Sequence, residues 1–124
     1  MYIKLLIITL LFSSLYSKHL HYEKYYQKIF CNKINGVMEY TLYDNTRVDC
    51  LTSTYAIEVD FANKWAESIG QSLYYSIETG KSAAVLLIIE SPKDIHYLKR
   101  FRKVSKQHDI QLFTIDKDLN IRRY

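Results

Sequence analysis

A continuous apolar run, Ala-Ala-Val-Leu-Leu-Ile-Ile at residues 83–89, constrains the fold more than any other feature of the chain. Gly80 stands before the run and Ser91-Pro92 follow it, so residues that interrupt regular structure lie on both sides. Such a run predicts a strand buried on both faces, because a strand with one exposed face would alternate with polar residues. The chain therefore has to cover both sides of a sheet.

The remaining segments alternate between helical and strand patterns and predict one domain over residues 18–124. Gly36, Asp44-Asn45 and Gly80 separate the segments, Asn63 is a candidate N-cap, and no repeat or Pro/Gly-rich linker intervenes. The predicted helices cover residues 21–32, 64–79 and 91–108, and the predicted strands cover residues 37–43, 47–52, 55–61, 83–90 and 110–115. This order predicts an α/β fold, a mixed sheet flanked by helices, with the first three strands as a meander.

Residues 1–17 have the layout of a secretory signal peptide. Lys4 gives a basic start, residues 5–12 are apolar apart from Thr9, and small residues follow. The apolar stretch is shorter than the roughly 20 residues that a membrane-spanning helix needs. A retained anchor and a buried N-terminal helix stay open, because Leu15 fits poorly near a cleavage site. We expect an exported protein, periplasmic or secreted, with no stable membrane association once the signal is removed.

The two cysteines, Cys31 and Cys50, predict one structural disulfide. An even number of cysteines in an exported chain favours pairing, whereas two thiols without clustered histidines make a poor zinc site. The bond would close a loop of about 20 residues and stabilise the fold by roughly 3 kcal/mol in the chain-entropy model.

Acidic residues gather on two neighbouring predicted strands. Period-two alternation places Arg47 and Asp49 on one face, with Val48 and Cys50 opposite, and places Glu58 and Asp60 together on the next strand. Three polar residues of the following helix, Lys64, Gln71 and Tyr75, fall close to one line, while Trp65, Ile69 and Leu73 form the packing face. Carboxylates at neighbouring strands suit Mg²⁺, which prefers oxygen ligands. An ordinary half-exposed strand is the alternative explanation.

These residues resemble the PD-(D/E)XK nucleases, and most closely the branch that contains RecB-type exonuclease domains and some resolvases. That family carries an acid on the second strand, Glu-x-Lys on the third and Gln-x-x-x-Tyr on the next helix. Asp49, Glu58, Gln71 and Tyr75 match this pattern, over roughly residues 38–90. The resemblance implies a restriction-endonuclease-like αβββαβ core, here followed by a C-terminal helix and strand.

Asp60 departs from the pattern, because the family has Lys at this position. Either Lys64 reaches in from the helix to supply the amine, with Asp60 as a further metal ligand or base, or catalysis is lost and the scaffold only binds nucleic acid or another partner. The resemblance implies that Asp49, Glu58 and Asp60 hold Mg²⁺ (or Mn²⁺) and that Gln71 and Tyr75 orient the phosphate or a metal-bound water.

Basic residues predict contacts with a nucleic acid backbone, expected to be DNA. Residues 93–106 form a basic amphipathic helix that includes Lys99, Arg100 and Lys103, and Arg47 fits either a salt bridge or a phosphate contact. The net charge of +4 is too small to argue for nucleic acid by itself. We expect a metal-dependent DNase with little sequence specificity; whether two copies pair is left open.

Overall fold

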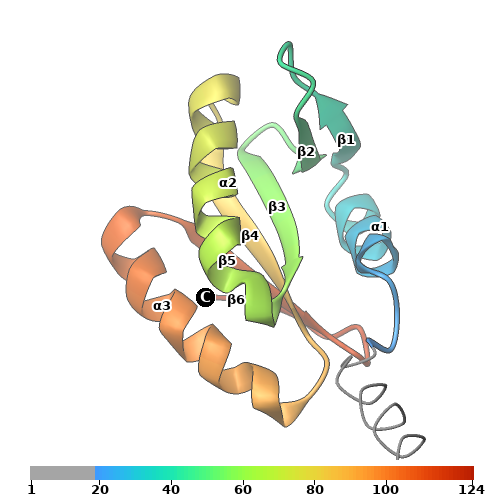
Figure 1. Cartoon of the computed structure of the whole chain (residues 1–124). Coiled ribbons are helices and arrows are strands. Elements are labelled where there is room, and N and C mark those ends of the chain that lie inside the picture. The colour runs from blue at the N-terminus through green and yellow to red at the C-terminus, as the bar shows by residue number, and fades with distance from the viewer. Residues whose placement is uncertain (1–18) are drawn as a thin grey trace, which may run out of the picture.

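The computed structural model describes residues 19–124 (Figure 1). The predicted signal peptide, residues 1–17, lies outside the described residues. Within residues 19–124, no helix combines the length and the apolar character that crossing a membrane requires.

One six-stranded sheet organises these residues, with its strands in sequence order from β1 to β6. The first three strands form an antiparallel meander, β3, β4 and β5 run parallel, and β6 returns antiparallel. The strands are β1 (Val37–Thr41), β2 (Arg47–Leu51), β3 (Tyr55–Phe61), β4 (Ser82–Ile89), β5 (Gln111–Asp116) and β6 (Ile121–Arg123). The helices are α1 (Glu23–Lys33), α2 (Trp65–Thr79) and α3 (Ile95–His108), with 3₁₀ turns η2 (Ala62–Lys64) and η3 (Pro92–Asp94) before the last two. The prediction of an α/β fold with a mixed sheet flanked by helices is confirmed.

Helix α1 covers one face of the sheet alone, as Figure 1 shows. Its buried residues Tyr26, Phe30 and Cys31 pack against apolar side chains of β3, β4 and β5. The predicted disulfide joins Cys31 of α1 to Cys50 of β2, with 5.8 Å between their Cα atoms. A Cβ atom at Gly36 would lie 2.3 Å from one of these sulfur atoms, so only glycine lets the chain pass the disulfide.

Helices α2 and α3 cover the opposite face (Figure 1). Leu98 and Phe101 of α3 pack on the sheet with Trp65 and Ile69 of α2. The prediction that Leu73 belongs to the packing face of α2 is wrong, because Leu73 is exposed. Its place is taken by Ser68, Ser72 and Tyr75, which are buried. The two serine hydroxyls donate to the carbonyls of Trp65 and Ile69 in the preceding turn, so the helix satisfies its own buried polar groups.

Most predicted boundaries differ from the observed ones by one or two residues. Strand β3 has the predicted limits, and Gly80 ends α2 in the left-handed conformation with φ 70°. Asn63 is not the N-cap of α2, because the chain first makes the 3₁₀ turn η2. Strand β6 was not predicted, because three residues are too few to show an alternation of apolar and polar side chains. The strand forms because the Asp116 carboxylate accepts the N–H groups of Asp118 and Asn120 and so turns the chain back.

Candidate active site: a carboxylate cluster between diverging strands

Strands β2 and β3 separate at the point where the predicted acids begin. Their ladder consists of the pairs Cys50↔Ile57 and Leu51↔Ala56. Beyond them, the Asp49 carboxylate accepts the backbone N–H of Val59 at 2.8 Å. A side-chain oxygen therefore takes the place that a backbone carbonyl would hold in a continued ladder, and the carboxylate lies between the two strands.

An unusual backbone conformation on β1 lies opposite this separation. Glu39 has φ 55°, in the left-handed region that costs a non-glycine residue about 1–2 kcal/mol. Gln27 of α1 is buried and its side-chain amide donates to the Glu39 carboxylate at 3.1 Å and to the Asp49 carbonyl at 2.8 Å. One amide thus ties α1 to both strands of the hairpin and holds the strained residue in place.

The twist of this hairpin overturns part of the predicted side-chain alternation on β2. Val48 packs with Tyr75 on the α2 side, whereas Cys50 lies in the core on the α1 side. Val48 and Cys50 were predicted to share a face, which assumed a regular strand. Because β2 is irregular here, the Asp49 side chain points between the strands.

Strand β3 alternates as predicted and contributes two buried acids. Ile57 and Val59 face the α1 core, and Glu58 and Asp60 project to the other side, beside Val85 and Leu87 of β4. Their exposed fractions are 6% for Glu58 and 5% for Asp60, so this is not the half-exposed strand of the alternative explanation. Both acids lie near other carboxyl groups, Glu58 near Asp49 and Asp60 near Glu23 at the start of α1.

The environment of these four carboxyl groups disfavours their charged forms. Burial, followed by repulsion from Asp49 and Asp60, raises the pKa of Glu58 most strongly. Burial also raises the pKa of Asp49, although the N–H of Val59 partly offsets it. Burial and Glu23 raise the pKa of Asp60 to about 7, against the lowering effect of Lys64. Acids this close together and this shielded from water resist ionising together unless positive charge joins them.

Lys64 and Tyr75 lie near the acids. Lys64 belongs to η2 and is exposed, and its positive charge lowers the pKa of both Asp60 and Glu23. Tyr75 is buried, and burial followed by the charges of Glu58 and Asp49 raises its pKa to about 12. Gln71 is exposed on α2, and within residues 19–124 its side chain makes no hydrogen bond to the acids.

Two members of the cluster, Glu23 and Gln27, were missed by the sequence analysis. They lie one helical turn apart on α1, which places them on the same side of the helix. A glutamate in the first turn of a helix has an ordinary explanation in the helix dipole, so Glu23 gave no distinct signal. A glutamine four residues later, among apolar side chains, was the weak signal that could have marked this face.

The predicted nucleic-acid-binding residues are all exposed. Arg47 forms a 3.7 Å ion pair with Glu39, which corresponds to the salt-bridge alternative. Lys99, Arg100 and Lys103 lie on the exposed side of α3, and α3 packs against the η2 turn that carries Lys64.

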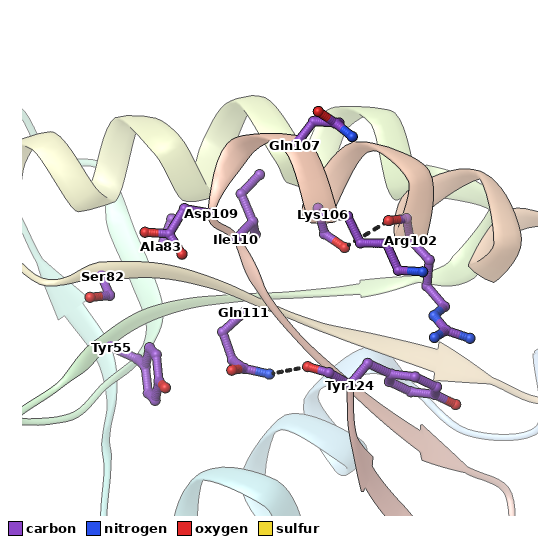
Figure 2. Close-up of a pocket in the computed structure, with 11 residues that line it drawn as sticks. Tyr55, Ser82, Ala83, Arg102, Lys106, Gln107, Asp109, Ile110, Gln111 and Tyr124 are labelled. Carbon is purple, nitrogen blue, oxygen red and sulfur yellow. Dashed lines mark hydrogen bonds between the residues drawn. The ribbon is translucent and has the colours of Figure 1, made fainter.

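A separate pocket lies at the other end of β3 (Figure 2). It has a volume of about 470 Å³ and is lined by Tyr55 at the start of β3, by Arg102 and Lys106 of α3, and by Tyr124. The Arg102 guanidinium stacks over the Tyr124 ring at 4.8 Å. None of the four carboxyl groups lines this pocket, so it is distinct from the cluster.

The donor chemistry of the cluster suits a divalent cation, because all four side chains offer hard oxygen atoms. Within residues 19–124, however, no three His, Cys, Asp or Glu side chains are arranged as a metal-binding group.

Comparison with known proteins returned no matching family model, no matching curated protein and no matching solved structure.

Proposed function

We propose that this protein is a metal-dependent DNA phosphodiesterase, a divergent member of the PD-(D/E)XK nucleases. The observation that supports the proposal is the burial of Glu58 and Asp60 with the half-buried Asp49 and Glu23 nearby and Lys64 beside Asp60. Repelling acids destabilise a fold, so a purely structural role gives no reason to bury them together. The order α1-β1-β2-β3-α2-β4 is also the αβββαβ order that the resemblance implies.

Asp49, Glu58 and Asp60 would hold Mg²⁺ or Mn²⁺, with Glu23 close enough to Asp60 to add a fourth carboxylate. The bound cation would polarise a phosphate and lower the pKa of a water. The protons that Glu58 and Asp60 carry would be displaced on binding, because a cation and a proton compete for the same oxygen atoms.

The surrounding residues position the acids and supply charge. The Val59 N–H fixes one oxygen of Asp49, and Gln27 fixes the backbone beside it. Lys64 supplies positive charge next to Asp60, in place of the lysine that the family carries on the strand itself. Tyr75, held in its neutral form, can donate a hydrogen bond to a phosphate oxygen. The exposed basic residues of α3 would add contacts with the DNA backbone, and these weaken as salt rises.

A second candidate function is an inactive nuclease scaffold that binds nucleic acid or another partner. The observation that favours it is Asp60, whose carboxyl group adds negative charge at the position where the family carries an amine. An acid there can bind a cation but cannot neutralise a phosphate.

Plasmid nicking distinguishes the two candidates. The purified, disulfide-intact protein is incubated with supercoiled DNA and Mg²⁺ or Mn²⁺, and EDTA serves as the metal-free control. The nuclease predicts metal-dependent nicking that falls by at least about 100-fold in Asp49→Asn, in line with the loss of a group that stabilises the transition state. Asparagine can still accept the Val59 N–H, so this variant should fold. Asp118→Asn, at an exposed aspartate of the β5–β6 turn, is the matched control.

Lys64→Ala then tests the relocated amine, with Lys33→Ala at the exposed end of α1 as its control. Loss of nicking in Lys64→Ala alone supports the assignment of the amine to Lys64. Absence of nicking by the folded protein would favour the inactive scaffold, and nicking that persists in EDTA would contradict a metal-dependent nuclease.

We further propose that this activity is exercised outside the cytoplasm. The Cys31–Cys50 disulfide is compatible with an exported protein, because such bonds persist in oxidising compartments.

A further inference from the structure

A groove lined mainly by rings opens at the start of α1. It has a volume of about 680 Å³ and is lined by His19, Leu20, His21, Tyr22, Glu23, Tyr25 and Phe61. The Tyr22 side chain is 89% exposed and that of Tyr25 39% exposed. Large apolar side chains that are exposed together commonly mark a binding surface.

Contacts between rings fix the shape of this groove. His21 stacks on Tyr25 with 4.2 Å between ring centroids, and Tyr25 meets Tyr26 edge to face at 5.2 Å. The Tyr26 hydroxyl donates to Glu90 at 2.7 Å, which anchors the set to the end of β4. On the other wall, His19 lies parallel to Phe61 at 3.5 Å. These rings are therefore held in place before any ligand arrives, which lowers the entropic cost of binding.

The groove and the carboxylate cluster share a wall. Glu23 lines the groove and lies near Asp60, and Phe61, which also lines the groove, directly follows Asp60 on β3. A molecule seated on the rings thus has its next chemical group beside the acids and Lys64. A nucleic acid strand meets this requirement, because each base is joined to a phosphate.

We infer that the groove binds an unpaired base of single-stranded DNA, so that the protein engages single-stranded ends or overhangs. A base inside a duplex has both faces covered by its neighbours, whereas an unpaired base can stack on an aromatic ring. Stacking of this kind tolerates any base, which agrees with the expected lack of sequence specificity. Cleavage of the bound strand rests on the proposed function, but the binding of the base does not.

The test measures binding separately from cleavage. Asp49→Asn protein, in Mg²⁺, is titrated into a labelled single-stranded oligonucleotide and into a blunt duplex of the same sequence, and affinity is followed by fluorescence anisotropy. We expect the single strand to bind at least about tenfold more tightly. Adding Tyr22→Ala should weaken single-strand binding by about tenfold, within the range measured for loss of one stacking ring. Tyr22→Phe, which keeps the aromatic ring, should retain the affinity for the single strand.

Tyr43→Ala is the matched control, because Tyr43 is 85% exposed in the turn between β1 and β2 and lies outside the groove. A terminal 2-aminopurine gives a second readout, since its fluorescence falls when it stacks on the groove rings. Equal affinity for single strand and duplex, no binding, or an effect of Tyr43→Ala equal to that of Tyr22→Ala would overturn the inference.

The outcomes also separate this inference from the proposed function. Tyr22-dependent binding of the single strand, together with wild-type protein that never nicks DNA, would remove the nuclease and leave the inference standing. If wild-type protein nicks DNA, and if Tyr22→Ala and the use of single-stranded or duplex DNA make no difference, the nuclease would stand and the inference would be lost.

Discussion

Strand β3 presents opposite chemistry to its two faces. Toward α1, Ile57 and Val59 join an apolar core that is closed by the Cys31–Cys50 disulfide. Toward α2, the same strand buries Glu58 and Asp60 against other carboxyl groups. The apolar face stabilises the fold and the acidic face destabilises it, although the side chains on both faces are almost fully buried. The difference teaches that burial alone does not stabilise a strand, because the chemistry of the buried groups decides the sign of their contribution.

The sharpest way to test this contrast is to change one residue on each face. Leu86→Ala removes a fully buried side chain from the α1 core and should lower the free energy of unfolding by about 2–5 kcal/mol. Glu58→Gln should leave it unchanged or raise it at pH 8 in EDTA, because a neutral amide removes repulsion. Urea unfolding measures both. A loss in Glu58→Gln comparable to that in Leu86→Ala would remove the distinction between the faces.

Removing the disulfide should have the next largest effect. The bond closes a loop between positions 19 residues apart, and its loss should lower the free energy of unfolding by about 3 kcal/mol. The double variant Cys31→Ala/Cys50→Ala tests this in urea against wild-type protein in the absence of reductant. Retention of full stability would show that α1 is held by its apolar contacts alone.

The smallest expected effect is a dependence of stability on pH. The pKa of Asp60 is raised from 3.8 to about 7, and those of Asp49 and Glu58 are also raised. The folded protein therefore keeps protons that the unfolded chain has already released, and stability is lost as pH rises through the folded-state pKa values. Between pH 5.5 and 8.5 in EDTA, we expect the free energy of unfolding to fall by more than about 1 kcal/mol.

Glu58→Gln should reduce this slope, and Asp118→Asn should not change it. A stability that is flat, or that rises, over the same interval would show that the acids are not protonated in the folded protein.

The fold could be predicted largely from local patterns. The limits of β3 and the burial of β4 followed from alternation and from a continuous apolar run, which are properties of neighbouring residues. The placement of Glu58 and Asp60 on one face of β3 followed from the same period, whereas the position of Asp49 depends on the irregular course of β2. Strand β6 could not be found in this way, because its formation depends on the Asp116 turn and on pairing with β5.

The candidate site was only partly predictable, because its remaining parts arise from packing between distant segments. Glu23 and Gln27 join the acids only when α1 folds across the hairpin, which no local pattern encodes. The left-handed conformation of Glu39 breaks the period-two rule beside Asp49. Ser68 and Ser72 pack where Leu73 was expected, because their small side chains bond within the helix and let it lie flat on the sheet.

The most direct test of the account is a titration of the protein with Mn²⁺ or Mg²⁺ at pH 8, followed by its thermal unfolding midpoint. A cation that binds only the folded protein stabilises it by about 2.7 kcal/mol at 100 times its dissociation constant. We predict a midpoint that rises with metal in wild-type protein and in Asp118→Asn, and that no longer rises in Asp49→Asn. An unfolding midpoint that does not change with metal, or that rises equally in Asp49→Asn, would contradict the assignment of the carboxylate cluster as a cation site.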